Sequence, residues 1–482
     1  MKAVESGIVG PESRICEYYR LAKGHRLVGW LFNPYKLLRP GWRDPTPLSV
    51  EEFDVLVRCD GQTPWGEEEP ATERALLARY VEEGVVESLE HACPLDEEQR
   101  YHLYPCWEFK TINWAITGRC NYNCKHCFAA KDLNPLAAHP TAEQCLSFVE
   151  ELERCGIRHV WLTGGEPLLR DDFLQLAQAL SDAGIRIEDL GTNGSLITPA
   201  LLDVLEAMGQ HPQFNVSFDG LGHHDWMRGV PGAEQRTLDA IACLKQRGYR
   251  VKVQYCLWDA NLDTLRDTTC LLDRMGVDHL RIIRVVEAPR WKHIGAAHTL
   301  DIRAYYDCML DYVGWYLKQG VGMYLDVWSL LAYDPKTQRY DFVPVRACGR
   351  DREHLQPVCA DARNMPFVAS DGSLTLCNQI SGWEAAHGVS RGNVYESPLQ
   401  ELLSDSAFTQ QLLVTVARVR DHNPQCGECP FLDLCDCGCR AVALATTDDL
   451  LAADQTRCAF FYGGYLERFD ALFRLHGCGG GA

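Results

Sequence analysis

Between residues 111 and 286, short apolar segments alternate with amphipathic ones, and this alternation limits the folds that the chain can adopt. Strands are predicted at residues 111–117, 159–162, 185–190, 214–218, 251–257 and 280–286. Helices are predicted between them, at residues 141–155, 171–183, 199–208, 237–246 and 262–275. Alternation of this kind is typical of a parallel sheet, because each helix carries the chain back across the sheet. The predicted fold class is therefore α/β, with a sheet that is open or curled into a partial barrel.

The chain of 482 residues is long enough for several domains. Residues 1–108 lack the alternation and are predicted to form a small N-terminal domain. The alternating core is assigned to residues 109–335, and a cysteine-rich domain to residues 336–465. Residues 466–482 are predicted to form a C-terminal helix and a flexible tail, because the last residues are mostly glycine.

Composition excludes some classes of partner. The formal net charge of −19 makes general nucleic-acid binding a poor fit, because the phosphate backbone would repel the chain. The N-terminus has no secretory signal pattern, and no apolar run reaches the roughly 18 residues that a membrane helix needs. We therefore expect a cytoplasmic protein with no membrane partner. In a reducing compartment, 23 cysteines are more typical of metal binding than of disulfides.

Three cysteines directly follow the first predicted strand. Cys120, Cys124 and Cys127 are separated by three and then two residues. Three thiolates can hold a four-iron cluster and leave one iron without a protein ligand, which is typical of a reactive site. The alternatives are unrelated buried thiols or a zinc site, although zinc would require a fourth ligand nearby.

The segment from Cys120 to Cys127 resembles the signature of the radical S-adenosylmethionine (SAM) superfamily, and the resemblance extends over about residues 111–300. It implies a partial (β/α)6 barrel in which SAM binds the open iron and is cleaved to a 5′-deoxyadenosyl radical. Segments after the next strands resemble those that face SAM in that family. The SAM-binding residues that the resemblance implies are Gly164, Gly165, Glu166, Asn193, Ser217 and Arg228. Ordinary turns are the alternative for most of these segments, and a solvated surface charge is the alternative for Arg228.

The C-terminal third contains a second cysteine pattern, with seven cysteines at the spacings of one domain family. They are Cys359, Cys377, Cys426, Cys429, Cys435, Cys439 and Cys458. The pattern resembles the SPASM extension of radical SAM enzymes that mature peptides and proteins, with Cys348 as an eighth ligand. The resemblance implies two auxiliary [4Fe-4S] clusters, for a total of three. The first would take Cys348, Cys359, Cys377 and Cys439, and the second Cys426, Cys429, Cys435 and Cys458. A zinc ribbon is the alternative, and Cys437 could replace a neighbouring ligand.

Residues 25–91 weakly resemble the winged-helix domain that recognises leader peptides in ribosomal peptide pathways. That domain binds a leader as an added strand at a sheet edge. Its presence would make a precursor peptide with a leader the partner of this chain. A generic helical cap on the barrel is the alternative.

The resulting hypothesis is a radical SAM peptide maturase that installs a thioether, carbon–carbon or carbon–oxygen crosslink, with flavodoxin or ferredoxin as external electron donor. A sulfatase-maturing enzyme is less favoured, because Asn378 follows Cys377 where such enzymes carry an acidic base. A peptide epimerase is another alternative, with Cys256 or Cys308 as hydrogen-atom donor. A non-catalytic scaffold or redox sensor is the alternative outside enzymes. A tRNA-modifying enzyme is disfavoured, because the chain is acidic and has no basic module.

Overall fold

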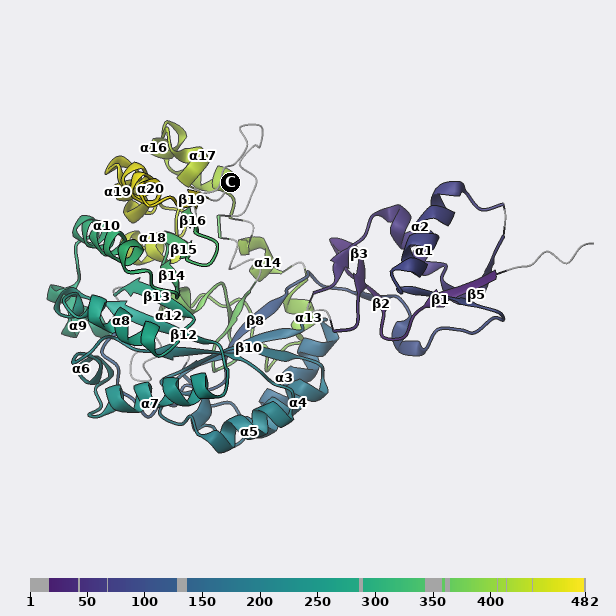
Figure 1. The fold of residues 1–482 in the computed structure, drawn as a ribbon, viewed down its shortest axis with the longest axis horizontal. Coiled ribbons are helices and arrows are strands. Elements are labelled where there is room, and N and C mark those ends of the chain that lie inside the picture. Colours follow the sequence, from purple (N-terminus) through teal and green to yellow (C-terminus); the bar gives the residue numbers. More distant parts are fainter. Residues whose placement is uncertain are drawn as a thin grey trace, which may run out of the picture. The chain divides into compact units, whose positions relative to one another are not determined.

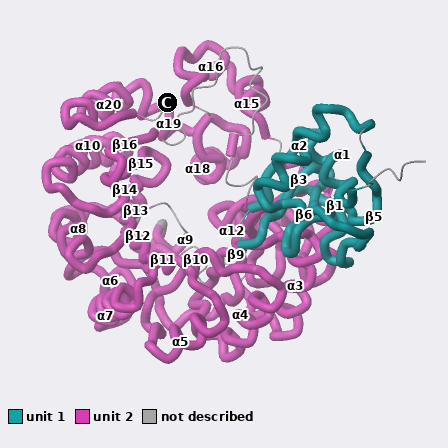
Figure 2. The backbone as a smooth tube through the Cα atoms, turned by 45° about the vertical axis from the view of Figure 1, so that its right-hand side comes forward, with its two compact units in different colours: residues 1–108 teal, residues 109–482 magenta. Residues whose placement is uncertain are grey.

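The computed structural model describes most of the chain in two compact units, residues 1–108 and 109–482 (Figure 2). The residues described are 17–41, 44–66, 68–127, 137–285, 289–342, 358–359, 365–404, 406–412, 414–435 and 437–480. Cys348 therefore lies outside the described residues.

The N-terminal unit combines mostly antiparallel strands with two packed helices (Figure 1). Its helices are α1 (Val50–Val57) and α2 (Ala71–Glu82). Its strands are β1 (Glu17–Leu21), β2 (Arg26–Trp30), β3 (Asn33–Leu38), β4 (Thr46–Pro47), β5 (Asp60–Trp65), β6 (Val86–Leu89) and β7 (His102–Tyr104). They form two sheets, ordered β5-β1-β6 and β4-β3-β2-β7.

Helix α1 has a clear start signal in the sequence. The Ser49 hydroxyl accepts from the Glu52 amide at 3.2 Å, and the Glu52 carboxylate accepts from the Ser49 amide at 2.8 Å. This capping box satisfies two amides that would otherwise lack a partner at the helix end. Phe53 and Leu56 of α1 then pack with Leu21 of β1 and Tyr80 of α2 in the core of the unit.

The second unit is built on a parallel sheet whose strands β8 to β13 follow one another in space as they do in sequence. Its helices up to residue 319 are α3 (Ala142–Arg154), α4 (Phe173–Asp182), α5 (Pro199–Ala207), α6 (His224–Arg228), α7 (Ala233–Gln246), α8 (Leu265–Arg274), α9 (Pro289–Ile294) and α10 (Ile302–Gln319). Its strands up to residue 327 are β8 (Thr111–Ala115), β9 (His159–Thr163), β10 (Arg186–Thr192), β11 (Gln213–Ser217), β12 (Val251–Leu257), β13 (His279–Arg284) and β14 (Tyr324–Val327). The predicted α/β fold with a partial barrel is confirmed.

The sheet is curved, and its two faces differ. Figures 1 and 2 show α3, α4, α5, α7 and α8 along its outer side. Strand residues on that side are apolar and fully buried; Trp114 of β8, for example, meets Phe148 of α3 with ring centroids 4.8 Å apart. Residues alternate between the two faces of a strand, so the intervening side chains face the inner side of the curve.

The cysteine-rich segment returns to the first strand of the barrel. Its helices are α12 (Asn378–Ala386), α13 (Leu399–Leu402), α14 (Ala407–Leu412), α15 (Val416–His422), α16 (Pro424–Gly427), α17 (Leu432–Cys435), α18 (Arg440–Thr447), α19 (Gln455–Tyr462) and α20 (Tyr465–Leu475). The remaining strands are β15 (Leu331–Asp334), β16 (Arg339–Phe342), β17 (Phe367–Val368), β18 (Leu374–Thr375) and β19 (Gly479–Gly480). Strand β17 pairs in parallel with β8, so the sheet continues past its first strand.

The predicted flexible tail is wrong for residues 477–480. Strand β19 pairs in parallel with β16, and the Gly479 amide donates to the Gln338 carbonyl at 2.9 Å. The Cys478 side chain is buried, 3.8 Å from the Tyr333 hydroxyl. A small side chain between glycines allows this close edge pairing, which glycine content alone does not reveal.

Among the described residues, no helix is long and apolar enough to cross a membrane.

Candidate functional site

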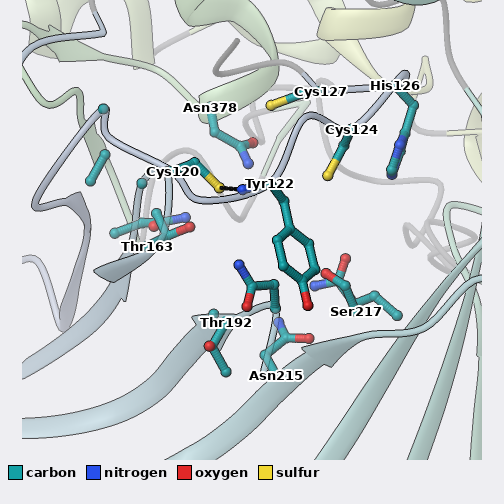
Figure 3. Close-up of a pocket in the computed structure, with 18 of the residues that line it drawn as sticks. Cys120, Tyr122, Cys124, His126, Cys127, Thr163, Thr192, Asn215, Ser217 and Asn378 are labelled. Atoms are coloured by element: carbon teal, nitrogen blue, oxygen red, sulfur yellow. Dashed lines mark hydrogen bonds between the residues drawn. The ribbon is translucent and has the colours of Figure 1, made fainter. Parts of the chain in front are cut away.

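A cavity of about 1170 Å³ lies on the inner side of the curved sheet (Figure 3). Alternate residues of successive strands line it, as the two-residue period of a strand requires. These residues are Asn113 and Ala115 of β8, Trp161 and Thr163 of β9, Asp189 and Gly191 of β10, Asn215 and Ser217 of β11, Gln254 and Cys256 of β12, and Arg281 and Ile283 of β13.

The loop that follows β8 brings Cys120, Cys124 and Cys127 to the wall of this cavity. Figure 3 shows the Tyr122 amide donating to the Cys120 sulfur, at 3.4 Å. Three thiols on one loop beside an open space form the soft donor set that iron–sulfur clusters take. Within the part of the chain that the structure describes, no three His, Cys, Asp or Glu side chains are arranged to hold a metal ion directly. The evidence for this site is therefore the donor chemistry and the position of the thiols.

Backbone hydrogen bonds attach the cysteine loop to the end of helix α6. The Asn123 amide donates to the Arg228 carbonyl at 3.1 Å, and the Lys125 amide donates to the Met227 carbonyl at 2.9 Å. Arg290 of α9 adds a bond from its guanidinium to the Cys124 carbonyl at 3.1 Å. The loop is thus held from two helices that lie about 100 to 170 residues further along the chain.

Gly164 and Gly165 allow the next strand to approach the start of this loop. Gly164 has a φ of +140°, and a Cβ there would lie 2.2 Å from the Thr117 carbonyl oxygen. A Cβ on Gly165 would lie 2.1 Å from the Arg119 carbonyl oxygen. Both glycines line the cavity, but the contact that requires them is with the backbone of residues 117–119.

Glu166 lies behind the cavity wall and is fully buried. Its carboxylate accepts from the Thr192 hydroxyl and the Asn193 amide, each at 2.8 Å, and from the Leu168 amide at 3.2 Å. Burial raises the pKa of Glu166 to about 7, against these hydrogen bonds, which lower it. Glu166 therefore orients the turn after β10, whereas Asn193 of that turn lines the cavity.

Asn193 connects this turn to the cysteine loop. Its side-chain Nδ2 donates to Asn121 Oδ1 at 2.8 Å, and its side-chain Oδ1 accepts from the backbone amide of Ser195 at 2.9 Å. Ser217, at the end of β11, lines the same cavity and is partly exposed to it. The residues proposed for SAM therefore lie on one continuous surface, apart from Glu166, which supports it.

Arg228 is buried in the cavity wall, so the alternative of a solvated surface charge is wrong. Its Nε lies 2.7 Å from Asp219 Oδ2, and its Nη1 lies 3.6 Å from the Cys124 sulfur. Burial alone would raise the pKa of Asp219, but the Arg228 cation holds it well below its usual range. The ion pair places a compensated positive charge beside the cysteine loop.

His224 is a site residue that the sequence did not reveal. Its Nδ1 accepts from the Asp219 amide at 3.0 Å, so its Nε2 carries the proton and donates to Thr237 at 3.2 Å. Thr237 in turn donates to the Asn193 carbonyl at 3.2 Å. Burial lowers the pKa of His224, which agrees with a neutral ring that joins the ends of β10 and β11.

The C-terminal cysteines gather in two groups. Cys359, Cys377 and Cys439 form the first: burial, followed by the neighbouring thiols of Cys439 and Cys359, raises the pKa of Cys377. The second group is Cys426, Cys429, Cys435 and Cys458. Burial and the neighbours Cys426, Asp454 and Cys429 raise the pKa of Cys458 to about 11. The two groups contain the cysteines that the sequence assigned to each auxiliary cluster, apart from Cys348.

Cys437 differs from its neighbours. It adopts a left-handed backbone with a φ of 58°, and its buried side chain packs with Val358, Val414, Val416 and Val419. Its thiol therefore contributes to an apolar core. Cys145 and Cys155 are likewise buried at helix α3.

Two further positions bear on the alternatives. Cys256 lines the cavity, whereas Cys308, on α10, does not. Asn378, the residue after Cys377, also lines the cavity, together with Gln379 and Ser381 of α12 (Figure 3). The first C-terminal cysteine group therefore adjoins the same space as the cysteine loop.

Comparison with known families identifies both parts of this arrangement. The model of the radical SAM superfamily matches residues 114–269. The chain contains a radical SAM domain. A second model, the SPASM iron–sulfur cluster-binding domain, matches residues 359–430. The predicted cofactors, SAM with a [4Fe-4S] cluster and auxiliary iron–sulfur clusters, are confirmed at the level of these domains, and so is the prediction that the chain is an enzyme.

Relatives of this chain carry names of different activities. An AdoMet-dependent heme synthase of Methanosarcina barkeri is 27% identical over 71% of the chain and 94% of its own length. A PqqA peptide cyclase of Ruegeria pomeroyi is 27% identical over 70% of the chain and 84% of its own length. The structure of Streptococcus suis SuiB bound to the precursor peptide SuiA has a TM-score of 0.62 at 14% identity, and covers 91% of this chain and 99% of that one. This last likeness shows a shared fold.

Proposed function

We propose that this radical SAM protein oxidises a ribosomally made precursor peptide and installs a crosslink in it, as a thioether, carbon–carbon or carbon–oxygen bond. The observation that supports this best is the double wall of the cavity. The cysteine loop lies on one side, and residues 378, 379 and 381, directly after Cys377, lie on another. A peptide side chain bound in this cavity would lie between the proposed radical source at the cysteine loop and the proposed electron acceptor at the first C-terminal cysteine group.

The electron balance explains why both walls are needed. SAM held beside the cysteine loop would supply, with one electron from an external donor such as flavodoxin or ferredoxin, the radical chemistry that takes one hydrogen atom from the peptide. Closing the crosslink then releases a proton and one electron from the peptide. Cys359, Cys377 and Cys439 would help to hold an auxiliary cluster, which would supply the acceptor for that electron. The peptide thus loses two hydrogens for each molecule of 5′-deoxyadenosine formed.

We assign to this site the residues that the sequence motifs predicted. Cys120, Cys124 and Cys127 hold the SAM-binding cluster, and the two C-terminal groups, with Cys348 in the first, hold the auxiliary clusters. Gly164, Gly165, Asn193, Ser217 and Arg228 line the cavity and would hold SAM, while Glu166 fixes the turn that carries Asn193. In this assignment the protein positions the reactants and excludes competing reactions.

The N-terminal unit is assigned to leader recognition in this proposal. The sheet β5-β1-β6 has β5 and β6 at its edges, and an extended peptide can add to a sheet edge as a further strand. The fold shared with SuiB supports this, because 91% coverage of the chain must include part of residues 17–108. The enzyme would work in the cytoplasm, where precursor peptides are made.

The test is mass spectrometry of the peptide encoded beside this gene, after anaerobic incubation with reconstituted enzyme, SAM and a reductant. A loss of two hydrogens, matched in amount by 5′-deoxyadenosine, is the expected result. An unchanged peptide mass together with active SAM cleavage would contradict crosslinking. Repeating the incubation in deuterated water would then test epimerisation. Cys256, which lines the cavity, is the candidate hydrogen-atom donor for that reaction.

Tetrapyrrole modification is the second candidate, because the heme synthase relative matches over 94% of its own length. Absorbance titration of the enzyme with a porphyrin separates the two: a saturable spectral shift without any change in the peptide mass would favour this candidate. Sulfatase maturation remains less favoured, because Asn378 occupies the cavity wall where an acidic base would be needed.

A further inference from the structure

A buried arginine lies between the two C-terminal cysteine groups. Arg457 is on helix α19, directly before Cys458, and only 2% of its surface is exposed. Its stem packs against the turn that links the groups: a Cβ built on Gly438 would lie 2.7 Å from Arg457 Cγ. Gly438 has a φ of +76° and stands between Cys435 of the second group and Cys439 of the first.

The charge of Arg457 acts on both groups. Cys435 and Cys439 both interact electrostatically with its guanidinium, as do Asp454 and Tyr306. Burial raises the pKa of Cys435 to about 12, and the Arg457 cation opposes that rise. One positive charge is thus near a thiol of each group, and the negative charge of Asp454 lies beside it: burial and Asp454 raise the pKa of Cys439 to about 11.

Asp454 holds the same junction from the other side. It is buried, and its Oδ2 accepts from the Cys439 amide at 2.9 Å. Its Oδ1 accepts from the Thr456 amide at 2.9 Å at the start of α19. The helix that carries Arg457 and Cys458 is therefore fixed to the backbone of Cys439 of the first group.

A fixed cation at this position has a predictable effect on redox chemistry. A cluster with four thiolate ligands is an anion, and reduction makes it more negative. In a buried environment of low dielectric constant, a nearby positive charge favours the more negative state. Removing the cation disfavours reduction of any cluster close to it.

We propose that Arg457 is a positioning residue shared by the two auxiliary clusters, and that its buried positive charge raises the reduction potential of both. The residue would make both clusters better acceptors for the electron that leaves the substrate. The inference rests on the ligand groups given under the proposed function and is independent of which substrate reacts.

The experiment compares reconstituted full-length variants by potentiometric titration followed by electron paramagnetic resonance. All carry Cys120→Ala, Cys124→Ala and Cys127→Ala, so that the signals come from the auxiliary clusters. Arg457→Gln removes the charge, and Arg457→Lys retains it. Arg468→Gln is the matched control, because Arg468 on α20 is exposed and pairs with Asp307 at 2.9 Å.

The expected result is that Arg457→Gln shifts both midpoint potentials to more negative values at unchanged iron content. Arg457→Lys and Arg468→Gln should leave both potentials where they are in the parent. Unchanged potentials in Arg457→Gln, or a shift of only one cluster, would overturn the shared role. An equal shift in Arg457→Lys would also overturn it. Such a result would show that the planar shape of the guanidinium, and not its charge, sets the potentials.

If Arg457→Gln loses iron, its potentials cannot be compared with those of the parent, and Arg457→Lys becomes the variant that tests the proposal. Full iron content and parental potentials in Arg457→Lys would support the role of the charge, and iron loss in both variants would show a packing role alone. No peptide enters the experiment. An unmodified peptide in the mass spectrometric test would therefore overturn the proposed function and leave these potentials as they are.

Discussion

Arg228 and Asp219 form an ion pair of 2.7 Å at which neither side chain is more than 8% exposed. The pair joins the end of β11 to helix α6, whose last turn holds the cysteine loop by backbone bonds. The position of the cysteine loop therefore depends on this ion pair, because the pair fixes helix α6 to the end of β11.

Replacing Asp219 with Asn should destabilise the protein strongly. The substitution leaves the Arg228 cation buried without its counter-charge, which typically costs about 3–5 kcal/mol. Thermal denaturation of the reconstituted protein measures the loss. The control is Asp203→Asn, since Asp203 is 62% exposed and pairs with Arg247, and its effect should stay within about 1 kcal/mol. Equal midpoints for the two variants would contradict this account of the pair.

Replacing Cys124 with Ala should abolish SAM cleavage and leave the auxiliary clusters in place. The iron content should fall by about one third, because one of three four-iron clusters is lost. Chromatography of 5′-deoxyadenosine and iron analysis of the same preparation give both readings. Cys243→Ala, on helix α7, is the control and should retain both. A normal yield of 5′-deoxyadenosine from Cys124→Ala would remove the assignment of this thiol.

Replacing Gly164 with Ala should disrupt the cysteine loop. The new Cβ would lie 2.2 Å from the Thr117 carbonyl oxygen at a φ that side chains rarely adopt, so the backbone must shift. We expect a loss of stability of about 2–4 kcal/mol, because the site is strained. Gly184→Ala is the control, because its φ is +67° and no atom lies within 4 Å of the added Cβ. Its cost should be about 1 kcal/mol, and similar losses for both variants would show that the close approach is unimportant.

Replacing Glu166 with Gln should change how stability depends on pH. Because the folded pKa of about 7 lies above the usual value of 4.5, the folded protein binds more protons than the unfolded chain between these two pH values. Stability of the parent should therefore fall as the pH rises from about 4.5 to about 7, by on the order of 3 kcal/mol for this group. Urea denaturation at pH 5.5 and pH 8 should show this fall in the parent and a smaller one in Glu166→Gln. Identical slopes would mean that Glu166 titrates at its usual pKa.

Deleting residues 1–108 should weaken peptide binding and spare SAM cleavage in the absence of peptide. The deleted unit has its own apolar core around Phe53, Leu56 and Tyr80, and the lining of the cavity described above comes from residues after 112. Fluorescence anisotropy with a labelled leader peptide measures the affinity. Unchanged affinity would remove the leader-recognition assignment from this unit.

The barrel could be predicted from sequence because each strand combines an apolar outer face with a defined neighbour along the chain. Val160 and Leu162 of β9, for example, are buried against helices, and the next strand follows one helix later. Strand β17 could not be predicted, because Phe367 and Val368 are too short a segment to show a period. The same reason applies to β19, where the glycines of the tail indicated flexibility.

The candidate site could be located from the cysteine spacing, but not its supporting contacts. Glu166 was assigned to SAM from its motif, whereas the structure places it behind the wall. His224 carries no motif, and its three-residue hydrogen-bond chain to Asn193 exists only in the folded protein. Side chains that act through other residues leave no local pattern, because their partners are distant in sequence.

The pairing of Phe367 in β17 with Asn113 in β8 has a consequence for biogenesis. A ribosome that has produced the whole barrel must still synthesise about 80 further residues before the outer edge of β8 can be covered. Until then this edge presents unpaired amides and carbonyls, which invite association with other nascent chains. The last step of barrel assembly is thus delayed until the cysteine-rich segment emerges from the ribosome.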